Sequence, residues 1–410
     1  MEIRPILSAL MRNKTGAILV ALQVALSLAI LANALHIVNE RRAVAARPSG
    51  IADEASVFYI RTRELANLTP EQQLAEQKRS RDTLRAVPGV LSVAYTSQMP
   101  LSRSGSTNSV AVDRKQTNET TSASMYMSGD SLVSTLGLKL VEGRDFLPQE
   151  VQEINEVSSA ELPRTIIITK PLADKMYPGA SAIGKTMFLG TGEGAIPVHI
   201  VGVVERLQTQ GAEITERGEF SSIVPVRLYG NPGAMFVVRA EPGQRDRVIK
   251  EAEAALTKAS PTPVILQSRT ADKDRSERYR ADVALAWMLI TVSVLLLLVT
   301  ASGIVGMASL WVTQRRKQIG VRRALGARKV DILRYFITEN FMITGCGVVG
   351  GVLLGVALNQ LLVSRLEMAR LPFEYLAGGA LLFLSLGVLA VYGPAWRAAS
   401  TSPALATRSA

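Results

Sequence analysis

One segment of the chain matches a motif that binds nucleotide phosphates. Residues 179–186, GASAIGKT, satisfy every fixed position of the pattern GxxxxGK[ST]. That chemistry needs a buried strand before the loop and a helix after it, so that backbone amides face the phosphates. Here a helical pattern ending at Tyr177 and Pro178 precedes the segment, and Met187–Leu189 predicts a strand after it. No Asp follows at the end of an apolar strand to hold magnesium. We therefore predict a turn with glycines at positive φ, and no ATP site.

The other reactive side chains do not form a catalytic or metal-binding set. The chain has two histidines, His36 and His199, and one cysteine, Cys346. Cys346 lies in a long apolar stretch, His36 lies at the end of another, and His199 belongs to a predicted strand. One cysteine also excludes a scaffold held by disulfides. We predict no enzyme active site and no metal site in this chain.

Four apolar stretches predict a membrane protein. Residues 16–38, 283–312 and about 341–363 contain no charged residue, and a fourth stretch covers 375–394. A helix that spans a bilayer needs about 20 predominantly apolar residues. The alternative is four core helices of a soluble domain, but such helices do not ordinarily contain runs such as LITVSVLLLLV. We predict four membrane spans.

The first apolar stretch has two interpretations. Arg4, Arg12 and Lys14 precede it, and Ala32-Asn33-Ala34 resembles a signal-peptidase site, as expected for a cleaved signal. Its apolar run is longer than the roughly 7–15 residues of a signal-peptide core. We therefore predict a retained membrane anchor.

The formal net charge of +11 is concentrated in short segments. Residues 1–15 carry +2, 313–335 carry +7 and 395–410 carry +2, whereas 39–282 contain 31 basic and 30 acidic residues. Short loops rich in Lys and Arg stay in the cytoplasm. The three basic segments are therefore predicted to be cytoplasmic, and residues 39–282 and 364–374 to lie outside. A short basic loop between two spans is a poor nucleic-acid-binding module, so we expect no nucleic-acid partner.

These patterns predict an integral membrane α-helical protein with a large extracytoplasmic α+β domain between the first and second spans. Strands and helices alternate in that domain. Its Ser- and Thr-rich residues 97–125 predict polar hairpins or a mobile insertion. The predicted segments are an N-terminus (1–15), first span (16–38), extracytoplasmic domain (39–282), second span (283–312), cytoplasmic loop (313–335), third span (336–363), periplasmic loop (364–374), fourth span (375–394) and cytoplasmic tail (395–410).

Two patterns near the third span predict contacts with other helices or with lipid. In residues 314–340 apolar and basic positions interleave, which predicts a short amphipathic helix, broken at Gly326, and then a helix from Lys329. Its basic face would suit anionic lipid, and its apolar face would suit a groove on a partner protein. The sequence leaves both open.

The third span carries a stripe of glycines. Gly347, Gly351 and Gly355 repeat every four residues. Small residues let membrane helices approach closely, so we expect this stripe to pack against a helix of the same chain or of a second copy. The alternative is the ordinary tolerance of membrane helices for glycine.

The chain resembles permeases of the MacB/FtsX-like family of ABC transporters, also called type VII transporters or mechanotransmitters. The layout matches: one span, a large external domain and three further spans. The most specific similarity is in Gln318–Ala327 (QIGVRRALGA), followed by Pro394–Arg397 (PAWR) and Ser402–Leu405 (SPAL). In the external domain, Tyr177–Thr186 (YPGASAIGKT) and Val201–Val204 (VGVV) are similar to the MacB-like periplasmic core domain.

The resemblance implies a permease subunit without its own ATPase site. Separate cytoplasmic ATPase subunits, two per complex, would bind ATP and magnesium, and their cycle would move the periplasmic domain to export or extract a substrate. Further implied partners are membrane lipid, a second permease as homodimer or heterodimer, and a periplasmic adaptor with an outer-membrane duct. The implied location is the bacterial inner membrane, with both termini cytoplasmic. The alternative is a signalling subunit that regulates a periplasmic partner such as a cell-wall hydrolase.

The resemblance also implies a coupling helix that seats in the ATPase. Arg322 and Arg323 would contact the ATPase, and Gly320 and Gly326 would set the helix ends. Gln318 departs from the family pattern, which usually has Glu there. The implied coupling residues are Ile319, Gly320, Val321, Arg322, Arg323, Ala324, Leu325, Gly326, Ala327, Ile332 and Leu333.

Overall fold

A computed structural model describes residues 14–157, 163–366 and 369–400. The chain divides into two compact units, one formed by the chain up to Ala45 and from Asp282 onward, the other by Ala46–Ala281. We call them the membrane unit and the periplasmic unit. The predicted segments at the two chain ends, including Ser402–Leu405, lie largely outside the described residues.

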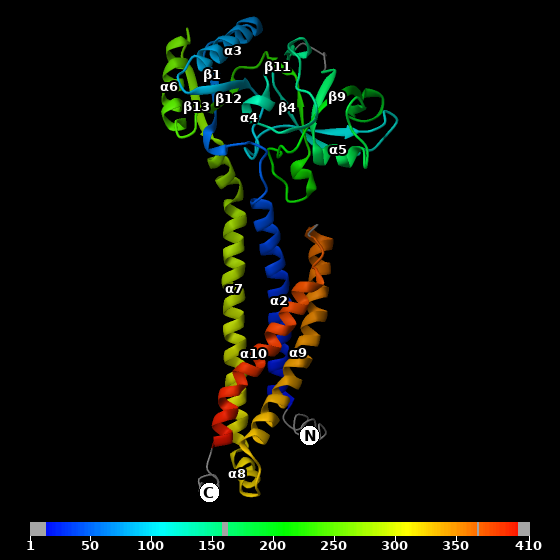
Figure 1. Cartoon of the computed structure of the whole chain (residues 1–410), viewed down its shortest axis with the longest axis vertical. Helices are drawn as coiled ribbons and strands as arrows, with labels where there is room; N and C mark the ends of the chain where they lie inside the picture. The colour runs from blue at the N-terminus through cyan, green and yellow to red at the C-terminus, as the bar shows by residue number, and fades with distance from the viewer. Residues whose placement is uncertain (1–13, 158–162, 367–368, 401–410) are drawn as a thin grey trace. The chain divides into compact units, whose positions relative to one another are not determined.

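The membrane unit is built from long apolar helices. Among the described residues, four helices are long and apolar enough to cross a membrane. They are α2 (Lys14–Ala45), α7 (Ala271–Gln314), α9 (Lys329–Leu366) and α10 (Phe373–Ser400), with the short α8 (Arg316–Ala324) between α7 and α9 (Figure 1). The predicted architecture, four spans with an inserted α+β domain, is confirmed.

The helices continue beyond the uncharged stretches that predicted them. α7 begins at Ala271, although the uncharged stretch begins at Val283. Residues 271–282 contain neither Gly nor Pro, so no residue there interrupts the helix. The uncharged stretch therefore marks the apolar part of the helix and not its ends.

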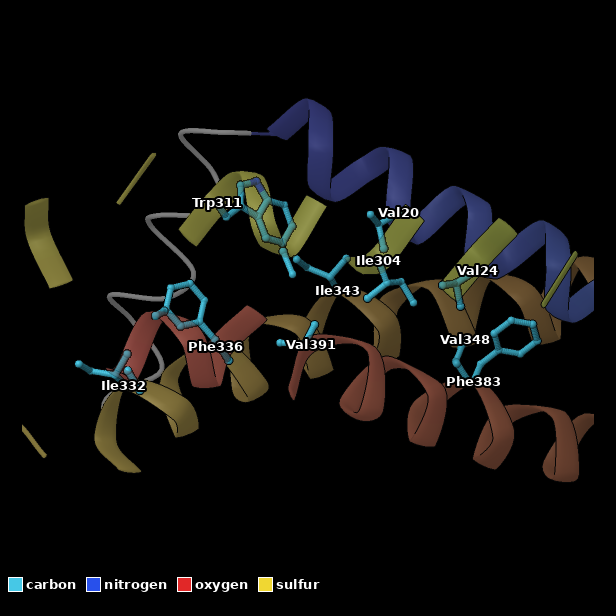
Figure 2. Packing of buried hydrophobic residues seen from close by; sticks show 14 of the residues in the cluster. Val20, Val24, Ile304, Trp311, Ile332, Phe336, Ile343, Val348, Phe383 and Val391 are labelled. Carbon is cyan, nitrogen blue, oxygen red and sulfur yellow. The ribbon is translucent and has the colours of Figure 1, made fainter. Parts of the chain in front are cut away.

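Helix α2 packs along α9 and also contacts α10. Val20 and Val24 of α2 share one buried cluster with Ile343 and Val348 of α9, and Figure 2 shows Val24 on the side of Val348. The Ala32-Asn33-Ala34 tripeptide lies inside α2, and the Asn33 side-chain amide donates a hydrogen bond to the carbonyl of Gly355 at 3.1 Å. The first apolar stretch thus forms a helix that packs within the membrane unit, and its retention in the mature protein stays a prediction.

The first part of the periplasmic unit is a four-stranded antiparallel sheet covered on one face by two helices. The strand order is β13-β1-β12-β2. Helix α3 starts in a capping box, because Thr69 and Gln72 each accept a hydrogen bond from the other's backbone amide. The elements are β1 (Val57–Glu64), α3 (Pro70–Arg85), β2 (Val90–Tyr95), β12 (Ala234–Ala240), α6 (Arg245–Ala259) and β13 (Val264–Thr270).

The second part is a larger mixed sheet of order β5-β9-β7-β10-β4-β3-β8, in which β8 also pairs with β9. The six strands from β9 to β8 in this order therefore form a closed ring of paired strands. A parallel ribbon of β6 and β11 accompanies it. The elements are β3 (Thr107–Ala111), β4 (Thr121–Met127), α4 (Leu132–Leu136), β5 (Leu140–Gly143), β6 (Gln152–Asn155), β7 (Thr165–Thr169), α5 (Lys170–Met176), β8 (Thr186–Leu189), β9 (Ile196–Val204), β10 (Ser221–Val224) and β11 (Val226–Tyr229).

Two segments within the Ser- and Thr-rich residues 97–125 form strands of this sheet. They contribute the antiparallel pair β3 and β4, and Val110 and Ala123 are buried at 1% exposure each. The hairpin alternative is confirmed. Small hydroxyl side chains occur in this interior because neighbouring strands and side chains satisfy their hydrogen bonds.

Candidate functional site

The candidate site is the basic segment, residues 315–336, which joins α7 to α9. Helix α8 ends at Ala324, and Gly326 has a φ of 98°. The amide of Gly326 donates to the carbonyl of Arg323 at 3.2 Å, and the amide of Ala327 donates to that of Arg322 at 3.0 Å. This pair of hydrogen bonds is the Schellman ending, which favours glycine in the left-handed region. The predicted helix break at Gly326 is confirmed.

The inward side of α8 is apolar and packed against α9. Ile319 is 8% exposed and belongs to the same buried cluster as Ile332 and Phe336. Gly320 is also buried, in the middle of α8. The expectation that Gly320 sets a helix end is wrong, because its neighbours keep helical hydrogen bonds and tertiary packing overrides the low helix propensity of glycine.

The outward side of α8 combines apolar and cationic side chains. Val321 is 51% exposed and Leu325 is 83% exposed. Arg322 and Ala324 are also exposed, whereas Arg323 is half-buried, with no hydrogen-bond partner for its Nε among the described residues. The predicted residues therefore divide into an inward set that holds α8 and an outward set that is open to a partner.

A buried ion pair fixes the start of the basic segment. Nη1 of Arg315 donates to both carboxylate oxygens of Glu339, at 2.7 and 2.9 Å, and the Glu339 side chain is 1% exposed. Arg315 also donates to the hydroxyl of Tyr335 at 3.3 Å, and the guanidinium of Arg322 lies 5.2 Å from the centre of the same ring. A buried carboxylate requires such a partner. The sequence shows Glu339 as an acid just before the third apolar stretch, but does not show which cation it meets.

The glycine stripe of α9 lies against α2 of the same chain. A Cβ atom at Gly347 would lie 2.7 Å from the carbonyl oxygen of Ala21, and one at Gly351 would lie 2.9 Å from the Cβ of Leu28. A Cβ at Gly355 would lie 3.0 Å from a methyl group of Leu376 in α10. The sequence left open whether the stripe packs against a helix of the same chain or of a second copy. In the structure it packs against helices of the same chain.

The segment that resembles a phosphate-binding loop is a structural turn. Gly179 and Gly184 have φ values of 72° and 76°, and the segment enters strand β8 and not a helix. Nζ of Lys185 lies 4.4 Å from the centre of the Tyr177 ring, and the Tyr177 hydroxyl donates to the carbonyl of Thr186 at 2.9 Å. The predicted turn with glycines at positive φ is confirmed, and its lysine contacts an aromatic ring.

The two histidines make separate local contacts. Nε2 of His36 lies 3.4 Å from the carbonyl oxygen of Ala369, and Nδ1 of His199 lies 3.1 Å from the hydroxyl of Thr186. Within the described ranges, no three His, Cys, Asp or Glu side chains gather in a way that could hold a metal ion.

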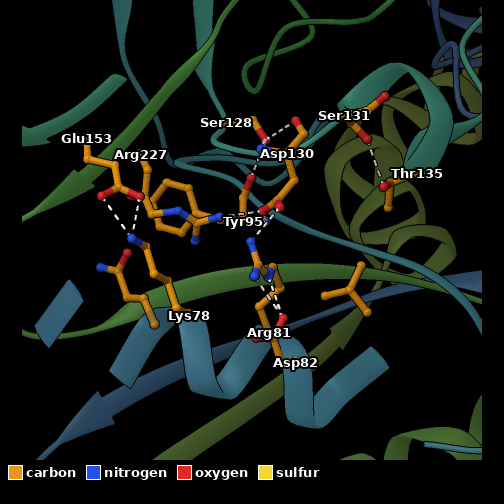
Figure 3. A network of polar contacts seen from close by, with 12 residues as sticks. Lys78, Arg81, Asp82, Tyr95, Ser128, Asp130, Ser131, Thr135, Glu153 and Arg227 are labelled. Atoms are coloured by element: carbon orange, nitrogen blue, oxygen red, sulfur yellow. Dashed lines mark hydrogen bonds and ion pairs between the residues drawn. The ribbon is translucent and has the colours of Figure 1, made fainter. Parts of the chain in front are cut away.

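Sequence reasoning missed an ionic cluster in the periplasmic unit, shown in Figure 3. Arg81 and Arg85 of α3 donate to one oxygen of Asp130 at 3.2 Å each. Arg227 of β11 donates to the other oxygen at 2.7 Å, and the amide of Tyr95 does so at 3.0 Å. Burial raises the pKa of Tyr95 to about 12. The cluster joins α3, β2 and β11 around one carboxylate.

Comparisons with known proteins match two parts of the chain. Residues 18–257 match the model of the MacB-like periplasmic core domain, and residues 290–403 match that of the FtsX-like permease C-terminal. The macrolide export ATP-binding/permease protein MacB of Chromobacterium violaceum is 26% identical over 295 residues, which are 70% of this chain and 43% of that protein. The pyoverdine export ATP-binding/permease protein PvdT of Pseudomonas putida is 28% identical over 280 residues, 63% of this chain and 39% of that protein. The chain thus spans about two fifths of the length of these relatives.

Two solved structures are similar to part of the chain. The extracellular domain of the noncanonic ABC-type transporter YknZ from Gram-positive bacteria has 17% identity and a TM-score of 0.32, and the match covers 52% of this chain and 100% of that one. The periplasmic region of MacB from Actinobacillus actinomycetemcomitans has 14% identity and a TM-score of 0.33, covering 57% and 97% of the two chains.

Proposed function

The chain belongs to the FtsX-like permeases with a MacB-like periplasmic core domain, and from this premise we propose that it is the permease subunit of an ATP-driven exporter. In this proposal two cytoplasmic ATPase subunits bind ATP and magnesium, and their cycle moves the periplasmic unit. Relatives named as ATP-binding/permease exporters of macrolides and of pyoverdine support an export role.

The observation that carries the proposal is the division of α8 into a held side and an open side. Val321, Arg322 and Leu325 offer an exposed surface that combines apolar groups with a cation. Helices that dock on partners use such anchors one helical turn apart. We assign this open side to the ATPase contact.

The held side would pass a movement of α8 to α9. Ile319 packs with Ile332 and Phe336 in one buried cluster, and Arg315 is tied to Glu339. Helix α9 then continues to Leu366 and packs on α2 through its glycines. Coupling over such distances needs packed, rigid elements, and these contacts supply a continuous series of them.

The proposed setting is the inner membrane, with both termini and the basic segment in the cytoplasm. The charge distribution supports this orientation, because residues 313–335 carry +7 and short basic loops stay inside. A second permease, as a homodimer or heterodimer, completes the proposed complex, and a periplasmic adaptor with an outer-membrane duct would complete an exporter. The match of residues 18–257 to the MacB-like domain favours export over a purely signalling subunit.

The test is the ATPase activity of the complex that copurifies with the tagged full chain, reconstituted in nanodiscs. The double variant Arg322→Glu/Arg323→Glu is expected to lower permease-stimulated ATP hydrolysis about tenfold or more, because it reverses the exposed cation of the open side and its half-buried neighbour. Gly326→Pro should act similarly, because proline cannot adopt the positive φ at that position.

The matched control is Arg114→Glu/Arg217→Glu, which reverses two exposed charges of the periplasmic unit. It should leave hydrolysis unchanged. Normal stimulation in the Arg322/Arg323 variant would contradict the proposal. If stimulation instead depends only on anionic lipid in the nanodisc, the basic face binds lipid and not the ATPase.

A further inference from the structure

A cavity of about 570 Å³ opens in the periplasmic unit on one face of the four-stranded sheet. Along β1 the side chains alternate, and Phe58 and Ile60 pack under α3 and α6. Val57 and Tyr59 point to the other face and are buried there in a second cluster. Arg61 and Arg63 follow on that second face, beyond the residues of the buried cluster. The cavity lies against these two side chains.

Arg61 and Arg63 line this cavity side by side on β1. Neither makes an ion pair with any carboxylate among the described residues, and Arg61 lies 5.6 Å from the centre of the Tyr59 ring. Nearby arginines are neutralised, as Arg269 is by Asp274 at 2.8 Å. The two guanidinium groups of the cavity therefore have no carboxylate partner within the described part of the chain.

The cavity also offers neutral and acidic polar groups. Gln267 lies directly opposite Arg61 in the β1–β13 pair and lines the same cavity. Among the described residues that line the cavity, Glu156 is the one with an acidic side chain. Its carboxylate accepts a hydrogen bond from the Asn231 side-chain amide at 2.6 Å. The described lining thus holds two cations, Arg61 and Arg63, and one carboxylate, which is already hydrogen-bonded. The net charge of these side chains is positive.

A second cavity of about 600 Å³ adjoins the first, because Glu156 and Leu228 line both. Its other lining is mostly apolar and includes Met125, Met127 and Ile154. Methionine side chains adapt to ligands of varied shape. A cationic compartment thus lies next to an apolar one within the same unit.

We propose that these adjoining cavities bind an amphipathic oxyanion, with its charged group at Arg61 and Arg63 and its apolar part over Met125 and Met127. Guanidinium groups bind anionic oxygens through paired hydrogen bonds. The volumes fall in the range of about 300–1,000 Å³ typical of small-molecule sites, which combine apolar walls with a few polar groups. The site is independent of the proposed export function, because it requires only the folded periplasmic unit.

The test is isothermal titration calorimetry on the full chain in phosphatidylcholine nanodiscs, with empty nanodiscs as the blank. The probes are 1-naphthyl phosphate and naphthalene-1-sulfonate, which join an anion to an apolar ring. Inorganic phosphate supplies only the anion, and 1-naphthol supplies only the apolar ring. Both naphthyl anions should bind at least about tenfold more tightly than either half. Absence of binding by both naphthyl anions would overturn the proposal, as would equal affinity for 1-naphthol.

Two variants and a control locate the site. Arg61→Gln/Arg63→Gln should weaken 1-naphthyl phosphate at least about tenfold. Gln267→Glu should also weaken it, because the new carboxylate would face Arg61 across the strand pair while both arginines remain. Arg114→Gln/Arg217→Gln removes two exposed charges elsewhere and should bind normally. Unchanged affinity in Gln267→Glu and in the Arg61/Arg63 variant, with melting temperatures like that of the parent chain, would place binding outside these cavities.

Discussion

Among single residues, Glu339 lies in an environment where a substitution should destabilise the membrane unit. Its carboxylate is 1% exposed, and Arg315 is its ionic partner. Removing one member of a buried pair leaves the other charge unpaired, so Glu339→Ala should lower the free energy of unfolding by about 3–5 kcal/mol. The measurement is thermal unfolding of the full chain in nanodiscs.

Two further variants serve as controls in the same unfolding measurement. Glu374→Ala removes an exposed acid at the start of α10 and should change stability little. Replacing both partners by apolar residues, Arg315→Met with Glu339→Leu, should recover most of the loss, because no charge is then left unpaired. A Glu339→Ala chain as stable as the parent would show that the pair does not hold α8.

Between elements, the packing of α9 on α2 depends on close approach. A Cβ at Gly351 would lie 2.9 Å from the Cβ of Leu28 and 3.0 Å from the carbonyl oxygen of Ala25. Gly351→Leu should therefore separate the helices and destabilise the unit by about 1–3 kcal/mol, as overpacking does. Gly345→Leu is the control on the same helix, because no atom lies within 4 Å of a Cβ there. Equal melting temperatures for the two variants would contradict this packing.

Elements with strong local signals could be predicted from the sequence, and short ones could not. Thr69 and Pro70 mark the start of α3, and the apolar run Val90–Tyr95 after the Pro88-Gly89 turn forms β2. Strands β10 and β11 are four residues each, too short for an alternating pattern to stand out. They form because neighbouring strands supply their hydrogen bonds, which no local pattern shows.

For the whole molecule, the charge distribution predicts which segments face the cytoplasm. With Cys346 replaced by alanine, a cysteine at Asn118 should react with a membrane-impermeant maleimide in intact spheroplasts. A cysteine at Lys317 should react only after permeabilisation, because the basic segment is proposed to lie inside. Both positions are exposed, so burial does not limit labelling. Labelling of the Lys317 position in intact spheroplasts would reverse the orientation.

The sequence by itself determined the four apolar helices, the inserted α+β domain and the helix break at Gly326. Each depends on neighbouring residues, through hydropathy, periodicity or a backbone angle that favours glycine. Only the tertiary structure decided that Glu339 meets Arg315, and that Arg61 and Arg63 line a cavity without an ion pair to any carboxylate that the structure describes. Those contacts depend on strand register and helix packing between segments far apart in the chain, and the sequence does not state which side chains such packing brings together.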